Sequence, residues 1–203
     1  MLIDEAEDVL EKYVAGKDQN RFEILEEIYK SDARVTFEIN SNSISFPLEI
    51  HGNREIAQVL SAEFNKKYDN VKTYYLSKKF PRIDNLIISK QRWLVLMREK
   101  ASNSIRVGTG FYDWKFEIKS NINLKIKHHH ICIGVMLNLP DLPLSFLSDL
   151  RMHLSYPWVE EDIVIEVIKK YKELNEVKNY LKTRMCRMGV AYEKVSQEKT
   201  SLH

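Results

Sequence analysis

The sequence predicts an α+β protein in which three N-terminal helices pack on a strongly curved antiparallel sheet, followed by a helical C-terminal extension. Three stretches before residue 70 place apolar residues every three or four positions, as amphipathic helices do. Four runs between residues 71 and 136 are rich in β-branched and aromatic residues, and the last two alternate apolar and polar residues, as half-buried strands do. Helices segregated from a block of consecutive strands are typical of the α+β class.

The N-terminal part is expected to hold the three helices and one strand. The first helix is predicted over residues 4–15, where acidic residues fill the first turn. The second is predicted over 21–30 and the third over 54–68, directly after Asn53, a residue type that often caps helix N-termini. Residues 33–40 alternate and predict a strand between the last two helices.

The main block of strands is predicted over residues 71–78, 86–100, 106–118 and 124–136. The second of these strands carries apolar residues on both faces, so we expect its centre to be covered on both sides. The last two form a hairpin, with Asn121 at the tip of its turn.

The predicted hairpin gathers the residue types that proton-transfer chemistry needs. Strict alternation around Asn121 places Trp114 opposite His128 and Tyr112 opposite His130. A histidine is the usual proton carrier near neutral pH, and a tyrosine hydroxyl can donate a hydrogen bond to a developing oxyanion. We therefore single out His130 and His128 as candidate catalytic bases and Tyr112 as the polarising acid. Four apolar residues are expected to line the accompanying pocket: Trp114, Phe116, Trp93 and Phe37.

The same pattern leaves other interpretations open. Both histidines could be hydrogen-bonded structural residues in a core or a subunit interface. His128, His130 and Cys132 could supply metal ligands, but the sequence offers no further ligand, and we expect no metal site. Lys115 opposite Lys127 is unfavourable, which indicates that a bulge or a one-residue shift could regroup the faces.

Composition and charge narrow the classes of partner. The 31 Lys+Arg residues nearly cancel the 29 Asp+Glu residues, so no strong field attracts nucleic acid or an anionic membrane. The N-terminus is acidic where a signal peptide would be basic, and no apolar run is long enough to span a bilayer. The two cysteines, Cys132 and Cys186, do not form a disulfide framework. We expect a cytoplasmic protein without cofactor, nucleic-acid or membrane partners.

The last third of the chain, residues 138–203, is predicted to be a helical extension. A short apolar helix follows two prolines, and a longer one begins near Val159 with an apolar stripe from Ile163 to Leu181. That stripe either packs on the rest of the chain, for instance across the mouth of the cone, or joins two copies. We expect a homodimer, because the stripe and the outer sheet face both need cover. The polar tail from Ser196 to His203 is expected to be mobile.

The element order, the HGNREIAQVL entry to the third helix, the GFYDWKFEI strand and the LKIKHHHI strand resemble the nuclear transport factor 2-like, or SnoaL-like, superfamily. The resemblance covers roughly residues 4–137, so we divide the chain into a cone domain, residues 1–137, and the extension. The resemblance implies a bent sheet around a cavity. In different members of the superfamily this cavity is the active site of an isomerase, a dehydratase or a polyketide cyclase, and in others it has no catalytic role. Phe37 stands where ketosteroid-isomerase-like members carry a catalytic aspartate, and Glu38 should point to the other face, which disfavours steroid isomerisation.

Two functional hypotheses follow. The first is a small-molecule pocket protein, acting as a cofactor-independent lyase or isomerase through the histidines and Tyr112. The second is a non-catalytic ligand-binding or protein-interaction scaffold. A cavity lined by the even-numbered hairpin residues would favour the first hypothesis, whereas a filled interior and an exposed apolar groove beside the last helix would favour the second.

Overall fold

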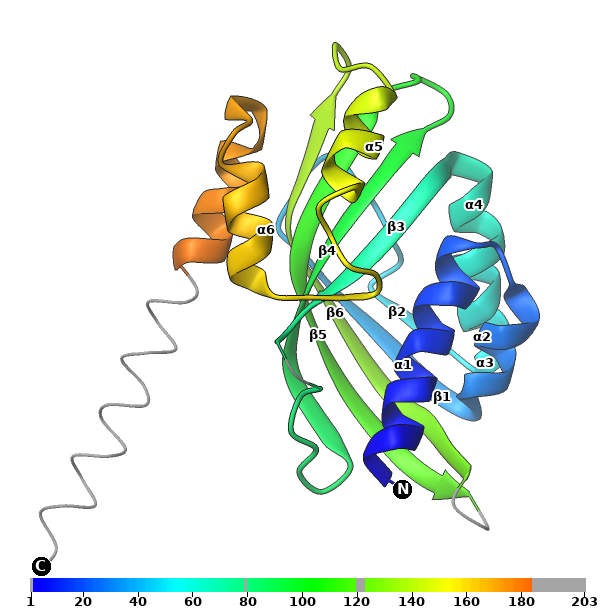
Figure 1. Ribbon diagram of the computed structural model, residues 1–203. Helices are drawn as coiled ribbons and strands as arrows, with labels where there is room; N and C mark the ends of the chain where they lie inside the picture. The colour runs from blue at the N-terminus through cyan, green and yellow to red at the C-terminus, as the bar shows by residue number, and fades with distance from the viewer. Residues whose placement is uncertain (1, 79, 120–122, 184–203) are drawn as a thin grey trace, which may run out of the picture.

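The computed structural model describes residues 2–78, 80–119 and 123–183, and it has the α+β architecture that the sequence predicts (Figure 1). Its helices are α1 (Leu2–Asp18), α2 (Phe22–Ile28), α3 (Asn53–Ala57), α4 (Phe64–Lys67), α5 (Ser145–Arg151) and α6 (Glu161–Ile168). Its strands are β1 (Tyr29–Ile39), β2 (Glu49–His51), β3 (Tyr68–Leu76), β4 (Ile87–Glu99), β5 (Ile105–Lys119), β6 (Asn123–Leu139) and β7 (Trp158–Val159). The predicted mobile tail and Cys186 lie outside the described residues.

The strands form one sheet in the order β2-β1-β6-β5-β4-β3-β7. Strand β1 pairs in parallel with β6, and β7 pairs in parallel with β3, so the sheet is mixed rather than purely antiparallel. Helices α1 to α4 lie on one side of the bent sheet, and α5 and α6 lie on the other (Figure 1). Both faces are therefore covered, as the apolar pattern of β4 predicts: Leu94 and Leu96 are fully buried on one face and Trp93 on the other.

The third predicted helix is one continuous helical stretch that changes its pitch. A π-helical segment, η1 (Gln58–Glu63), joins α3 to α4. Gly52 precedes α3 with φ +81°, a left-handed conformation that a glycine adopts without steric penalty. Asn53 is not the helix cap that the sequence predicts, because it is the first helical residue and its side chain donates to the Glu26 carbonyl oxygen at 2.9 Å. That bond ties the third helix to α2.

The C-terminal extension packs on the convex face of the sheet, not across the mouth of the cone. A long helix was expected from Val159, but α6 is followed by a short 3-10 turn, η2 (Lys172–Leu174), and a second helical stretch over residues 175–183. The apolar side chains of both pieces meet the sheet, and the contact includes Leu94, Leu96, Val107, Val135, Leu150, Val164, Ile168, Leu174, Val177 and Leu181. Burying this much apolar surface is the main favourable term that holds the extension in place.

This packing removes the reason given above for a homodimer. The apolar stripe of the extension and the outer face of the sheet each needed cover, and they cover each other. A homodimer stays a prediction, without that argument behind it. The predicted boundary after residue 137 falls inside β6, and β7 of the extension joins the same sheet. No helix in the described part of the chain is long and apolar enough to cross a membrane.

Candidate functional site

The hairpin of β5 and β6 contains a bulge that changes which residues share a face. Ile118 pairs with Leu124 and Phe116 pairs with Ile126, as predicted. The register then shifts, so that Trp114 lies opposite His129 and Lys115 opposite His128. Lys127 is the extra residue, which relieves the predicted Lys115–Lys127 contact. The prediction that Tyr112 and Trp114 share a face with His128 and His130 is therefore wrong.

His129 takes the interior position instead. Its ring stacks on Trp114, with centroids 3.6 Å apart, and its Nδ1 lies 2.7 Å from the hydroxyl of Tyr29. Burial holds the pKa of His129 well below its usual range, and His130 adds a smaller repulsion in the same direction. The imidazole is therefore neutral near pH 7. Its Nε2 is buried without a hydrogen-bond partner.

His128 and His130 lie on the convex side, in a shallow open depression of about 370 Å³ beside Arg34 and Asp113. His130 places Nδ1 2.9 Å from the Thr36 hydroxyl and Nε2 3.8 Å from a carboxylate oxygen of Glu38. These contacts fit a half-exposed structural histidine. Among the residues that the structure describes, no group of three or more His, Cys, Asp and Glu side chains is arranged to hold a metal ion.

The interior of the cone encloses a small cavity between the helices and the concave face of the sheet. Its volume is about 40 Å³, and Phe37, Trp93 and Tyr112 lie on its wall. The remaining wall is apolar except for Tyr13 and Lys17 of α1, and it includes Leu60, Phe64, Val95, Met97, Ile131, Ile133 and Met136. Trp114 and Phe116, the other two predicted lining residues, are buried in the adjoining core rather than on this wall.

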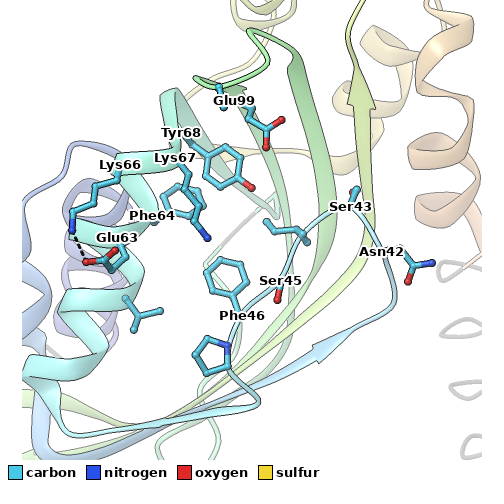
Figure 2. A pocket seen from close by; sticks show the side chains of 14 residues that line it. Asn42, Ser43, Ser45, Phe46, Glu63, Phe64, Lys66, Lys67, Tyr68 and Glu99 are labelled. Carbon is cyan, nitrogen blue, oxygen red and sulfur yellow. Dashed lines mark hydrogen bonds and ion pairs between the residues drawn. The ribbon is translucent and has the colours of Figure 1, made fainter.

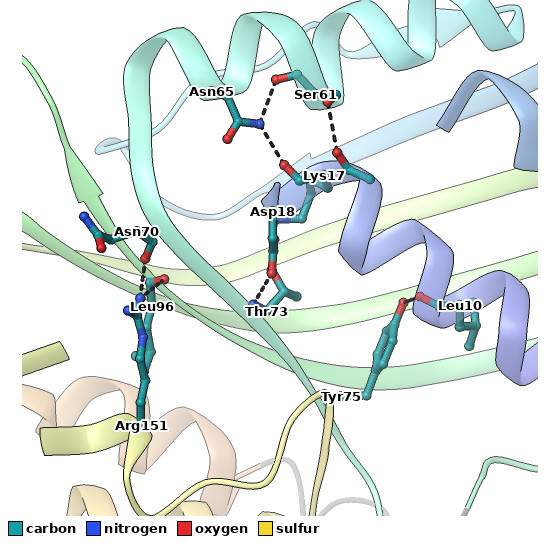
Figure 3. Close-up of polar contacts among 11 residues, drawn as sticks. Leu10, Lys17, Asp18, Ser61, Asn65, Asn70, Thr73, Tyr75, Leu96 and Arg151 are labelled. Carbon is teal, nitrogen blue, oxygen red and sulfur yellow. Dashed lines mark hydrogen bonds and ion pairs between the residues drawn. The ribbon is translucent and has the colours of Figure 1, made fainter. Parts of the chain in front are cut away.

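A buried ion pair borders the cavity at the end of α1, where Figure 3 shows the Asp18 carboxylate bonded to Thr73. The ammonium of Lys17 lies 2.7 Å from Asp18 Oδ1, and the two side chains are only 8% and 1% exposed. Thr73 on β3 donates to the same carboxylate twice, from its backbone N–H at 2.6 Å and its hydroxyl at 2.8 Å. The Lys17 ammonium also lies 4.7 Å from the centre of the Phe64 ring. These contacts fix the positions of both charged groups beside the cavity.

Two further residues of the cavity wall carry buried polar atoms without a hydrogen-bond partner, the hydroxyl of Tyr13 and Nε1 of Trp93. The Tyr13 hydroxyl lies close enough to that of Tyr112 for each to affect the other's pKa. Burial raises the pKa of both phenols well above the usual value, so both remain protonated donors at neutral pH. The polar side of the cavity thus consists of hydrogen-bond donors.

The cavity adjoins a wider mouth of about 730 Å³ (Figure 2). One side of the mouth is the connection between β1 and β2, and the other is the helical stretch from Val59 to Lys67. Ile44, Phe46 and Phe64 line both the mouth and the inner cavity, so they form the partition between the two spaces. The inner cavity alone has room for about one water molecule, whereas ligand pockets commonly measure about 300–1,000 Å³.

Sequence reasoning missed the contribution of α1 to this site. Tyr13 falls on the predicted apolar stripe of α1 and reads as ordinary core, while Lys17 and Asp18 follow Gly16 and read as a solvated helix end. Their burial depends on β3 and the third helix packing over the end of α1, which no local pattern encodes. Ile44 and Phe46, which alternate with serines in the connection between β1 and β2, are the one local signal that could have been used.

Comparison of the sequence with models of known families gives no match, and no curated protein matches it. Solved structures do match. A type 2 hexachlorocyclohexane dehydrochlorinase superposes with a TM-score of 0.55 at 14% identity, over 68% of this chain and 89% of that one. A nuclear transport factor 2-like protein from Salmonella enterica serovar Typhimurium gives 0.53 at 10% identity, over 70% and 94%. A candidate scytalone dehydratase from Novosphingobium aromaticivorans gives 0.50 at 14% identity, over 66% and 85%.

The bent sheet, the helices on its concave side and the enclosed space between them define an α+β cone protein with an interior pocket. The matching structures show that the chain has the fold of the nuclear transport factor 2-like superfamily, as its resemblance to that superfamily predicts. At these identities the similarity concerns the fold alone, because one fold carries many functions.

Proposed function

We propose that the chain binds a small molecule inside the cone, with an apolar body and one hydrogen-bond acceptor or anionic group. The observation that carries this proposal is the set of donors on the cavity wall: the Tyr13 hydroxyl and Trp93 Nε1, which donate to no partner, and the Lys17 ammonium, which Asp18 holds beside them. Buried donors without partners are unfavourable unless another molecule supplies the acceptor. The apolar remainder of the wall suits the body of such a ligand.

A second candidate is cofactor-independent lyase or isomerase chemistry in the same pocket. Tyr112 and Tyr13 hold two protonated phenols side by side on the cavity wall, an arrangement that can stabilise an oxyanion as it forms. Two of the structures that share the fold are, by name, a dehydrochlorinase and a candidate dehydratase, both classes of elimination enzyme. His128 and His130 are not proposed as the base, because they face away from this cavity.

The binding proposal can be tested with the variant Tyr13→Phe, which removes a buried hydroxyl whose one polar neighbour is the Tyr112 hydroxyl. Its free energy of unfolding should be nearly unchanged, because the lost contact with Tyr112 is offset by the removal of a buried polar group. Its affinity for 1-anilinonaphthalene-8-sulfonate, an apolar body with an anionic group, should fall about tenfold, the loss of about one hydrogen bond to a charged group. Affinity for the neutral N-phenyl-1-naphthylamine should not change.

Two outcomes would contradict the proposal. One is equal affinity of wild type and Tyr13→Phe for the sulfonate, which would place that probe elsewhere on the protein. The other is a fall in unfolding free energy for Tyr13→Phe, which would show that the hydroxyl serves the fold and not a ligand. Tyr171→Phe, a tyrosine change in the extension on the convex side, is the matched control and should alter neither quantity.

A further inference from the structure

The partition between the mouth and the cavity is built around the ring of Phe46. This ring stacks on Phe37 of β1, with centroids 4.8 Å apart and planes 6° from parallel. It is also nearly parallel to Phe64 on the helical side, at 6.4 Å and 17°. Phe46 therefore links the sheet layer to the helix layer through two parallel rings. Figure 2 shows Phe46 and Phe64 side by side at the mouth.

The segment that carries Phe46 is held at points on either side of the ring. Residues 40–48 form an irregular connection, and its neighbouring residue Leu48 is 82% exposed. Before Phe46, the hydroxyls of Ser41 and Ser43 donate to the Met136 carbonyl oxygen, and Arg106 donates to the Ser43 carbonyl oxygen. After Phe46, the Leu48 carbonyl oxygen accepts from the Phe37 N–H at 3.0 Å. The backbone is therefore held on both sides of Phe46, and the ring can leave its position by rotation of its own side chain while these anchors hold.

Displacement of the Phe46 ring would enlarge the inner cavity to the size of a ligand pocket. Phe46 and Ile44 separate a space of about 40 Å³, too small for a ligand, from one of about 730 Å³. With Phe46 withdrawn, the two spaces join, and the vacated position lies against the flat face of Phe37. A planar ring placed there would keep the stacking that Phe46 makes now, whereas a rounded aliphatic body would lose it.

We propose that Phe46 occupies, in the free protein, the position of a planar aromatic ligand, and that such a ligand displaces it to bind. This inference rests on the proposed binding function and adds the class of ligand and the entry route. Phe64 contacts both Phe46 and the Lys17 ammonium. A carboxylate or another acceptor on the edge of the bound ring would therefore point toward Lys17, Tyr13 and Trp93, the donors of the cavity wall.

The test compares Phe46→Ala with Leu48→Ala, a truncation in the same connection at an exposed position. The probes are naphthalene-2-carboxylate, which is planar, and adamantane-1-carboxylate, which has a similar size and charge but is rounded. Phe46→Ala should bind the planar probe at least about tenfold more tightly than wild type, because the ligand no longer has to displace the native ring. Leu48→Ala should bind it like wild type, and the rounded probe should gain much less in either variant.

The outcomes separate this inference from the proposed function. If Phe46→Ala binds both probes more tightly by the same factor, the proposal that the ligand is planar would be wrong. Wild type and Phe46→Ala binding the planar probe equally well would overturn the role of Phe46 and leave a binding function in place. No binding of either probe to any variant would contradict both. If Phe46→Ala does not fold, Phe46→Leu, which keeps the apolar volume but not the flat face, should show the same order of affinities with a smaller gain.

Discussion

The concave and convex faces of the sheet are both covered, but the coverings differ in kind. On the convex face, the extension contributes a continuous apolar layer that packs on β3, β4, β5 and β6. On the concave face, α1 and the third helix leave a cavity, a buried ion pair and donors without partners. The irregular connection of residues 40–48 contributes Ile44 and Phe46 to the partition between that cavity and the mouth. We therefore expect substitutions on the convex side to act mainly through packing, and substitutions on the concave side to act through buried charge and cavity as well.

The largest effect should come from the ion pair on the concave side. Asp18→Ala leaves the Lys17 ammonium buried without its carboxylate and should lower the free energy of unfolding by about 3–5 kcal/mol. Denaturant unfolding measures this change. The double variant Lys17→Met, Asp18→Ala should recover only part of the loss, because no charge is then buried but the N–H and hydroxyl of Thr73 still lack their acceptor. Asp8→Ala, in the same helix with its side chain 58% exposed, is the control and should cost less than about 1 kcal/mol.

The convex side should respond mainly through packing, although the Arg92–Glu161 ion pair also joins the sheet to the extension. Leu174→Ala removes a fully buried side chain from the layer between extension and sheet and should cost about 2–5 kcal/mol. Ile163→Ala, also in the predicted stripe but 43% exposed, should change stability by less than about 0.5 kcal/mol. Equal effects at the two positions would mean that the extension does not pack on the sheet in this way. Neither variant should change the binding of 1-anilinonaphthalene-8-sulfonate.

A second convex-side variant tests the position of the extension directly. Gly134 is the extra residue of a bulge in β6, and a Cβ atom added there would lie 2.1 Å from the Tyr180 ring. Gly134→Ala should therefore destabilise the protein by about 1–3 kcal/mol. Removing the ring as well, in Gly134→Ala, Tyr180→Ala, should give a smaller loss than the sum of the two single variants. Strict additivity would show that the two residues do not meet.

The smallest effect concerns pH and the buried histidine of the concave side. Burial lowers the pKa of His129 in the folded state, so below its unfolded-state pKa of about 6.5 the unfolded chain binds one more proton. The contribution of His129 is fully present above pH 6.5 and should decline by up to about 1.4 kcal/mol per pH unit below it. In His129→Phe, the free energy of unfolding should fall less steeply as the pH is lowered below 6.5, whatever the effect of the substitution on stability at pH 7. An unchanged slope would mean that His129 is not held neutral.

The fold was largely predictable, because its elements have strong local patterns. Alternation and an enrichment in β-branched and aromatic residues located the four main strands, and the two buried faces of β4 could be read from Trp93, Leu94 and Leu96. The helical stripes located α1, α2 and the third helix. The solved structures of similar fold agree with the class inferred from these elements.

The site was less predictable, for two physical reasons. A bulge adds one residue without changing the alternation on either side of it. The KHHHI run is therefore compatible with either face of the strand pointing inward. The unfavourable Lys115–Lys127 pair was the one sign in the sequence that the register shifts. The burial of Lys17 and Asp18 is a tertiary effect, since charged residues at the end of a helix normally face water. Long-range packing, which fixes both features, leaves no periodic trace in the sequence.

The most direct test of the contrast between the two faces is methyl NMR of the protein labelled at methionine, titrated with 1-anilinonaphthalene-8-sulfonate. Met97 and Met136 lie on the wall of the inner cavity, whereas Met152 is 74% exposed in the extension. We expect the methyl signals of Met97 and Met136 to shift with a common dissociation constant and the signal of Met152 to stay in place. A shift confined to Met152, or none at Met97 and Met136 when the probe is bound, would contradict this expectation.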